Sequence, residues 1–344
     1  MSDSLAIDHA SPTAPAGGVD AAAEYAAVRD DVGLLDRTDW GVLEVTGRDR
    51  AAFLHAMFTN DIKGLAPGQG CAAAFLNAHG KVQALVAVWA LEDRLLVVTP
   101  PGRAGALLEG LDRYLFAEKA ALRDATGELA LFLLAGPRAP ALVARLAGVA
   151  LPEAPWAHVA GSVAGVEVRL VRGGGETGEP EGWVAAPATA AAAVRAALVE
   201  AGARPVGPEA FEALRIEAGT PVLGRDVDDT VLLPEIPFLH LVSYTKGCYL
   251  GQEVVVRIRD RGHVNRHLRG LVIEAEAVPA PGAAVRAGDA DVGRVTSAAW
   301  CPRRARPLAL AYVRRQHAEP GTRLAVRAAG GDLPAVVSAL PFPR

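Results

Sequence analysis

The spacing of apolar residues along the first third of the chain predicts helices that alternate with strands. Tyr25, Val28, Val32 and Leu35 recur at helical spacing and predict a helix over residues 20–35. The pattern that follows predicts a strand over 40–45, a helix over 49–58, strands over 72–77, 82–91 and 94–99, and a helix over 104–114. A tight turn at 78–81 joins the strands 72–77 and 82–91 into a hairpin.

The middle of the chain repeats this order. The pattern predicts a strand over 129–134, a helix over 138–146, a hairpin over 159–171, a glycine-rich acidic loop at 173–182, and helices over 188–201 and 208–217. From Leu268 onward, short strands are separated by Pro-Gly and Gly-Asp turns, which is typical of a small β-barrel. The predicted fold class is α+β followed by β.

These elements divide the chain into three parts. Residues 1–20 are rich in Ala, Ser, Pro and Gly and lack the basic start and apolar centre of a secretory signal, so we expect a mobile leader. Residues 21–264 are expected to form the α+β region as two interleaved units, and residues 265–344 the barrel.

Composition and charge exclude several classes of function. The 344 residues are 51% hydrophobic, which suits a globular protein with two or three compact cores. A formal net charge of -4 contrasts with the basic excess of nucleic-acid-binding proteins, so no nucleic-acid partner is expected. No stretch approaches the roughly 18 apolar residues of a membrane-spanning helix, so no membrane partner is expected.

The three cysteines, Cys71, Cys248 and Cys301, are far apart and form no Cys-x-x-Cys pair. This spacing predicts neither a disulfide framework nor a metal site, and one copy of the chain cannot supply a four-thiolate iron–sulfur cluster. The small number and wide spacing of the cysteines fit a reducing compartment, so we expect a cytoplasmic protein. Cys71 and Cys301 stand beside apolar residues and are expected to be inert core thiols.

Residues 244–253 read Tyr-Thr-Lys-Gly-Cys-Tyr-Leu-Gly-Gln-Glu and carry the densest chemistry in the chain. Glycines permit close backbone approach, and a neighbouring ammonium, such as that of Lys246, favours the reactive thiolate of Cys248. The alternative is that Cys248 is a small buried hydrophobic residue at a strand-to-helix junction.

This segment resembles the signature of the YgfZ-type folate-binding family, whose members are relatives of the glycine-cleavage aminomethyltransferase and act in making or repairing iron–sulfur enzymes. The residues that carry the resemblance are Lys246, Gly247, Cys248, Tyr249, Gly251, Gln252 and Glu253. The resemblance covers about residues 22–330 and also includes the segments 43–47, 59–61, 214–219, 293–297 and 308–313.

The resemblance implies an aminomethyltransferase-like fold, a three-part ring that holds folate in a central channel and ends in a β-barrel. It implies a tetrahydrofolate-binding accessory protein for iron–sulfur cluster assembly or repair, with iron–sulfur client or assembly proteins as partners. In this interpretation Cys248 is the reactive thiol and Lys246 favours its thiolate. Gly247 and Gly251 shape the loop, and Gln252 and Glu253 orient neighbouring groups. The reaction stays open between attack on a one-carbon unit, exchange with a disulfide and transient ligation of iron.

Two departures separate the chain from ordinary aminomethyltransferases. The aspartate that is their main catalytic acid aligns with Gln83 or Ala84, neither of which titrates. Their acidic loop is retained at Glu179, but the second acid of that loop aligns with Val184. A folate-dependent aminomethyltransferase, or another one-carbon transferase or demethylase, is the alternative function, so enzymatic activity is left open. A folate-sensing module in which Cys248 only packs is a further alternative.

The resemblance also assigns folate contacts. They are Arg215, Asn60, Asp61 and Glu179, and a basic run near the motif adds Arg257 and Arg266 as candidates. Arg215 is equally explained by pairing with Glu212 or Glu217 on its own helix. Arg257 and Arg266 belong to a basic run at 257–269 that is either a solvated face or a site for the glutamate tail of folate or another anion.

Overall fold

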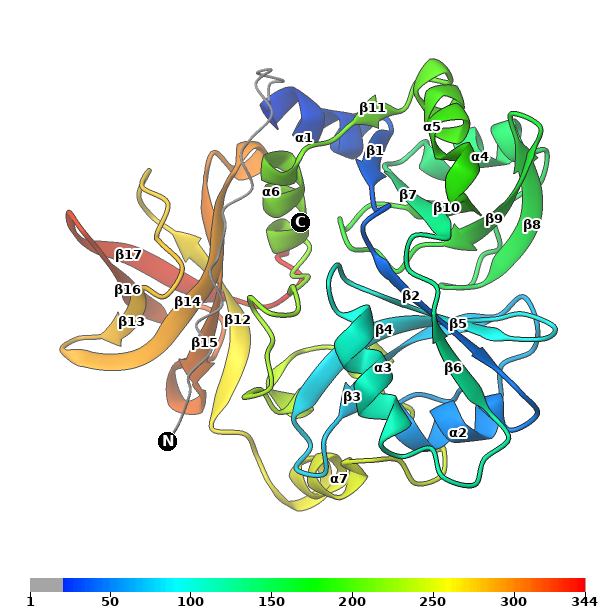
Figure 1. Cartoon of the computed structure of the whole chain (residues 1–344). Coiled ribbons are helices and arrows are strands. Elements are labelled where there is room, and N and C mark those ends of the chain that lie inside the picture. The colour runs from blue at the N-terminus through cyan, green and yellow to red at the C-terminus, as the bar shows by residue number, and fades with distance from the viewer. Residues whose placement is uncertain (1–20, 344) are drawn as a thin grey trace, which may run out of the picture.

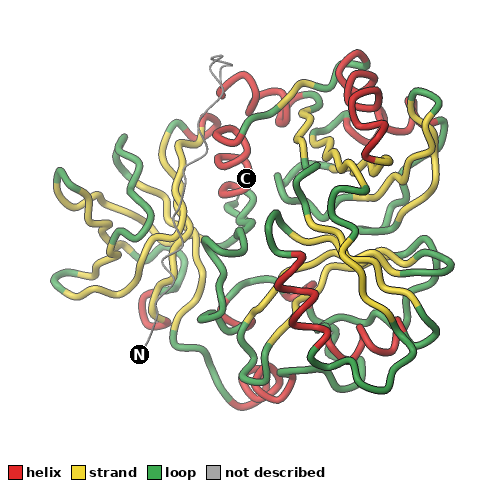
Figure 2. The backbone as a smooth tube through the Cα atoms, in the orientation of Figure 1, coloured by secondary structure: helices red, strands yellow, loops and turns green. Residues whose placement is uncertain are grey.

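The computed structural model describes residues 21–343, so the leader predicted for residues 1–20 lies outside the described residues. Figure 1 shows three groups of strands arranged around the middle of the molecule, and the helices lie around and between these groups (Figure 2). The groups are a six-stranded sheet, a five-stranded sheet and a closed six-stranded barrel.

The six-stranded sheet takes its strands from both sides of the five-stranded sheet in the sequence. Its strand order is β11-β1-β7-β10-β9-β8. The strands are β1 (Gly33–Asp36), β7 (Leu129–Ala135), β8 (His158–Val163), β9 (Val166–Arg172), β10 (Glu181–Pro187) and β11 (Arg204–Pro205), with helices α1 (Ala21–Asp30), α4 (Ala139–Ala147) and α5 (Ala191–Glu200). One apolar core joins this sheet to α4 and α5.

The five-stranded sheet is antiparallel throughout and has the order β3-β4-β5-β2-β6. Its strands are β2 (Gly41–Thr46), β3 (Gly70–Leu76), β4 (Val82–Ala90), β5 (Leu95–Thr99) and β6 (Ala121–Asp124), and its helices are α2 (Arg50–Met57) and α3 (Ala104–Asp112). Both helices bury their apolar side chains against one face of the sheet.

The predicted C-terminal barrel is confirmed. It closes in the order β12-β15-β14-β13-β16-β17 and encloses its own apolar core. Its strands are β12 (Arg266–Ile273), β13 (Ala284–Ala287), β14 (Ala290–Cys301), β15 (Arg306–Arg314), β16 (Arg323–Ala328) and β17 (Gly331–Ser338).

Two helices and several short turns connect the sheets to the barrel. Helix α6 (Pro208–Glu217) contacts α1, β14 and β15, so it lies between the six-stranded unit and the barrel. The 3₁₀ helices Leu233–Glu235 and Leu239–Leu241 follow, and α7 (Gln252–Arg261) precedes the barrel. Among residues 21–343 no helix is both long and apolar enough to cross a bilayer.

The helix predicted over 20–35 is wrong beyond Asp30. Residues 33–36 form β1, and its side chains alternate between two cores, with Leu34 in one and Leu35 in the other. Pairing of β1 with both β7 and β11 outweighs the apolar spacing that suggested a longer helix. The helix predicted over 188–201 begins as a 3₁₀ turn, and α5 starts at Ala191.

Candidate functional site

The motif at residues 246–253 begins in a loop that lies against the end of α2. The hydroxyl of Thr59 donates to the carbonyl of Leu241 at 2.5 Å, and the backbone N–H of Ser243 donates to the carbonyl of Thr59 at 3.1 Å. Thr59 is completely buried. The end of α2 therefore supports the entry to the motif loop.

Lys246 is the main side-chain anchor of this loop. Its ammonium donates to the carbonyl of His55, to that of Phe58 at 2.6 Å and to that of Asn60 at 3.1 Å. Unpaired carbonyls at the C-terminal end of a helix carry partial negative charge, so they attract a cation. Burial lowers the pKa of Lys246 to about 8, and Nζ lies 5.0 Å from the ring centre of Tyr249. Lys246 thus caps α2.

The three thiols differ in accessibility. Cys248 is exposed, Cys71 is partly buried and Cys301 is buried. Burial raises the pKa of Cys71 to about 12, with a further contribution from the Asp61 carboxylate. The titratable groups that act on the pKa of Lys246 are Asp61 and Cys71, and the predicted effect of Lys246 on Cys248 stays a prediction.

Asn60 and Asp61 both have local partners. The side-chain amide of Asn60 donates to the carbonyls of Ala72, at 2.8 Å, and His240, at 3.0 Å, which ties β3 to the motif loop. Oδ1 of Asp61 lies 3.1 Å from Nδ1 of His55. Their predicted contact with folate stays a prediction.

Gly251 fits the motif to the turn between β3 and β4. Its φ of +80° lies in the left-handed region, and a β-carbon on it would lie 2.5 Å from the carbonyl oxygen of Asn77. Across the same contact, a β-carbon on Gly80 would lie 2.9 Å from Cβ of Val254. The motif and the hairpin turn therefore meet backbone to backbone.

The other motif residues surround this contact. Tyr249 is buried, and its hydroxyl has no hydrogen-bond partner among the described residues. The N–H of Gln252 donates to the carbonyl of Tyr249 at 3.1 Å. Glu253 is exposed in the first turn of α7, where the partial positive charge of the helix N-terminus stabilises its carboxylate.

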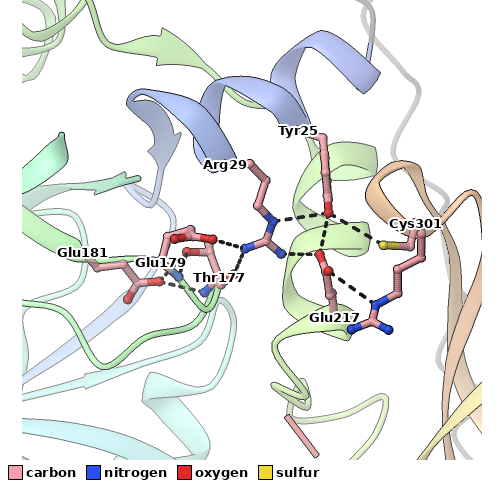
Figure 3. A network of polar contacts seen from close by, with 8 residues as sticks. Tyr25, Arg29, Thr177, Glu179, Glu181, Glu217 and Cys301 are labelled. Carbon is pink, nitrogen blue, oxygen red and sulfur yellow. Dashed lines mark hydrogen bonds and ion pairs between the residues drawn. The ribbon is translucent and has the colours of Figure 1, made fainter. Parts of the chain in front are cut away.

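A second polar cluster joins α1, the acidic loop and α6 (Figure 3). Arg29 on α1 donates to the carbonyl of Thr177 at 2.9 Å, to Glu179 at 2.8 Å and to Glu217 at 2.5 Å. The hydroxyl of Tyr25 donates to the same Glu217 carboxylate at 2.5 Å. Glu179, a predicted folate contact, is therefore held by Arg29.

This cluster continues into the barrel. Arg304, just beyond β14, lies 3.7 Å from Glu217, and the Tyr25 hydroxyl lies 3.7 Å from the Cys301 sulfur. Figure 3 shows Tyr25 and Arg29 from α1 meeting Glu217, with Cys301 of the barrel on the far side of the Tyr25 hydroxyl. Cys301 is thus a buried part of a junction between units.

The acidic loop also contains a buried pair of glutamates. Glu181 accepts hydrogen bonds from the N–H groups of Gly175 and Thr177, both at 2.7 Å. Burial and, to a smaller extent, the neighbouring Glu176 raise the pKa of Glu181 to about 7. Glu176 pairs with Arg37 at 3.0 Å.

Arg215 is fully enclosed by protein. It pairs with Glu212 on its own helix, as the sequence allowed, and with Asp226 at 2.6 Å. Both arms of the guanidinium are thus occupied in this structure, and folate contact by Arg215 stays a prediction.

The two arginines predicted to hold the folate tail differ. Arg266 forms a bidentate pair with Glu235, at 3.0 and 3.1 Å, and stacks 4.5 Å from the ring centre of Tyr312. Arg257 is exposed on α7. Within residues 21–343, no group of three or more His, Cys, Asp or Glu side chains is arranged to hold a metal ion.

Two family models match this chain and together cover both the sheets and the barrel. Residues 18–246 match the GCVT N-terminal domain, and residues 266–343 match the glycine cleavage T-protein C-terminal barrel domain. The chain belongs to the glycine cleavage T-protein family.

Relatives in this family are similar over nearly the whole chain. An aminomethyltransferase of Streptomyces avermitilis is 32% identical over 93% of this chain and 89% of its own length. A putative chloroplastic transferase of Arabidopsis thaliana is 29% identical over 90% of this chain and 71% of its own. The crystal structure of the glycine cleavage system aminomethyltransferase T from Bartonella henselae has the same fold, with a TM-score of 0.85 at 24% identity, covering 94% of this chain and 89% of that one. The predicted aminomethyltransferase-like fold is confirmed.

The resemblance aligns the aspartate of the aminomethyltransferases with two positions that lie on β4. The side chain of Gln83 is exposed, and its amide donates to the carbonyl of Val82 at 3.2 Å. Ala84 is buried in the core of the five-stranded unit. The correspondence of these two positions to the catalytic aspartate stays a prediction, and neither side chain titrates.

Sequence reasoning missed the residues that bridge the units. Tyr25 and Arg29 lie on one face of α1, and Tyr25 was counted as an apolar helical position. The spacing of four between them was the available signal, but their partners Glu179 and Glu217 lie far away in the sequence. His55, beside the motif loop, was missed for the same reason.

Proposed function

We propose that this protein is a YgfZ-type member of the family, a tetrahydrofolate-binding accessory protein for the assembly or repair of iron–sulfur clusters. Cys248 is the reactive thiol. The observation that carries the proposal is an exposed thiol in a loop that Lys246, Thr59 and Gly251 fix in place. A side chain that serves only packing is buried, whereas Cys248 faces solvent.

A second observation supports a role other than ordinary aminomethyl transfer. The resemblance aligns the catalytic acid of the aminomethyltransferases with Gln83, whose amide is exposed, or with Ala84, which carries only a methyl group. Neither group donates or accepts a proton at neutral pH, so general acid–base help from this position is lost.

Folate binding is supported by membership of the family and by the acidic loop. Glu179, Asn60, Asp61, Arg215, Arg257 and Arg266 are the proposed contacts. Arg257 is exposed and suits the glutamate tail, because a guanidinium binds a carboxylate through two parallel hydrogen bonds. The local pairs of Arg215 and Arg266 have to open or extend for these side chains to reach folate.

A folate-dependent one-carbon transferase is the second candidate. It is favoured by 32% identity to an aminomethyltransferase over 93% of the chain. This candidate predicts turnover of an aminomethylated or methylated amine with stoichiometric consumption of folate.

The test is complementation of a cell that lacks its own YgfZ-type protein, with the activity of an iron–sulfur enzyme as the readout. Wild type is expected to restore that activity, and Cys248→Ala is expected to fail. Cys301→Ala is the matched control for losing a thiol, and the melting temperature of each purified variant checks folding. Failure of well-expressed wild type would favour the one-carbon transferase, and equal rescue by Cys248→Ala would leave a folate-sensing module.

A further inference from the structure

Exposed arginines without an ionic partner gather where helix α7 meets the barrel. Residues 257–269 contain five arginines and one acid, although the whole chain carries a formal net charge of -4. Arg261, Arg314 and Arg315 are exposed, and within residues 21–343 none of them forms an ion pair. These three residues are called the basic surface below.

Backbone pairing brings the basic surface together. Arg314, at the end of β15, is in register with Arg266 at the start of β12, and the N–H of Arg315 donates to the carbonyl of Asn265 at 2.9 Å. Arg261 is the last residue of α7, and the chain passes from there directly into β12 (Figure 1). The three guanidinium groups therefore belong to one edge of the molecule.

The acids on this edge leave the basic surface with an excess of positive charge. Asp260 pairs with Arg259, and Glu235 pairs with Arg266. Glu319 is exposed after β15 and acts on the pKa of His267 together with Arg315. A local excess of one sign attracts the opposite charge, and the attraction extends over about 10 Å at 0.1 M salt.

An exposed aromatic side chain adjoins the basic surface. Tyr244, at the start of the motif loop, is 43% exposed, and the guanidinium of Arg259 lies 4.8 Å from its ring centre. Tyrosine and arginine are among the residues that contribute most to binding at protein interfaces. Arg259 covers one face of the ring, and a nucleic-acid base would need an open face to stack on. This stack therefore favours a protein partner over a nucleic acid.

We propose that the basic surface and the Tyr244–Arg259 stack dock the acidic face of a protein partner beside Cys248. Complementary charge steers two proteins into contact and fixes their orientation. Helix α7 begins four residues after Cys248, so a partner seated on α7 adjoins the motif loop. This inference rests on the proposed function, because an accessory protein has to meet its protein partner at the reactive thiol.

The test measures binding of a short fluorescein-labelled peptide, in which glutamate alternates with alanine, to the full-length protein by fluorescence anisotropy. Wild type is expected to bind this peptide, to lose affinity as salt is added, and not to bind the analogue with glutamine in place of glutamate. Combining Arg261→Ala, Arg314→Ala and Arg315→Ala is expected to weaken binding about tenfold, which corresponds to three exposed charge pairs of ordinary strength.

The combination of Arg113→Ala, Arg204→Ala and Arg327→Ala is the matched control. It removes three exposed arginines from other parts of the chain and changes the net charge equally. This control is expected to bind the peptide nearly as tightly as wild type. Equal weakening in the two triple variants would show that only net charge matters and would overturn the proposal. Tighter binding of a single-stranded oligonucleotide than of the peptide would also overturn it.

Two further measurements place the partner. Leucine in place of alanine in the peptide is expected to tighten binding to wild type but not to Tyr244→Ala. Saturating peptide is expected to slow alkylation of Cys248 by iodoacetamide, with Cys248→Ala supplying the background, and an unchanged rate would refute docking beside the thiol. Neither measurement uses an iron–sulfur enzyme, so failure of complementation by wild type leaves their outcome intact.

Discussion

Arg215 and Asp226 form an ion pair from which solvent is completely excluded, with Nη1 2.6 Å from Oδ2. The other carboxylate oxygen of Asp226 accepts from the hydroxyls of Thr296, at 2.5 Å, and Ser297, at 2.6 Å. The hydroxyl of Tyr312 donates to the backbone carbonyl of Asp226 at 3.0 Å. One aspartate thus connects α6 to strands β14 and β15 of the barrel.

Breaking this pair is expected to be costly. Arg215→Met leaves the buried Asp226 carboxylate without a charged partner, and Asp226→Ala leaves Arg215 with Glu212 alone. Breaking a buried pair typically costs about 3–5 kcal/mol in the free energy of unfolding. The double variant is expected to lose less than the sum of the two. Urea denaturation measures these effects, with Arg123→Ala, which breaks exposed pairs, as the control. Single variants as stable as this control would contradict the expectation.

Gly251→Ala is expected to destabilise the motif loop strongly. The variant has a left-handed φ and a β-carbon 2.5 Å from a backbone oxygen. Gly102→Ala is a matched control, because its φ of +70° is similar but no atom beyond its chain neighbours lies within 4 Å of the added β-carbon. In both variants the left-handed backbone lowers the free energy of unfolding by about 1–2 kcal/mol. Only Gly251→Ala should lose more in thermal unfolding, and equal losses would show that the close contact relaxes freely.

Lys246→Met is expected to loosen the loop at residues 242–251. Methionine keeps the apolar stem but leaves three carbonyls without their donor, which costs about 1–3 kcal/mol. Hydrogen exchange of the loop amides should accelerate in this variant. Lys63→Met, which replaces an exposed lysine, should leave exchange unchanged. Unchanged exchange in Lys246→Met would mean that the carbonyls find other donors.

Glu181 is expected to make the protein less stable as the pH rises from about 4.5 to about 7. Its pKa is raised from 4.5 to about 7 by burial and by Glu176, so the folded state holds a proton that the unfolded state releases in this range. Stability present below pH 4.5 is therefore lost toward pH 7, by up to about 3 kcal/mol. Glu181→Gln should flatten this slope in denaturation curves, whereas Glu153→Gln on the surface should not. Parallel slopes in wild type and Glu181→Gln would refute the assignment.

The periodicity of the sequence predicted most local elements, because their apolar faces repeat within a single helix or strand. It failed at β1, where Leu34 and Leu35 face two different cores and the partners β7 and β11 come much later. Helix α7 was hidden because its arginines read as a charge run, although Val254, Val255 and Ile258 mark its inner side. The motif made Cys248 and Lys246 candidates for the site, but the attachment of Lys246 to α2 depends on tertiary contacts that no spacing encodes.

The position of β1 has a consequence for the order of folding. Leu34 pairs with Leu134, one hundred residues later, while the five-stranded sheet forms entirely from residues between them. Closing a long loop costs more conformational entropy than closing a short one, so the intervening sheet shortens the effective distance once it has formed. During synthesis, β1 leaves the ribosome long before its partner. The five-stranded sheet is therefore expected to assemble first and to bring β1 to β7.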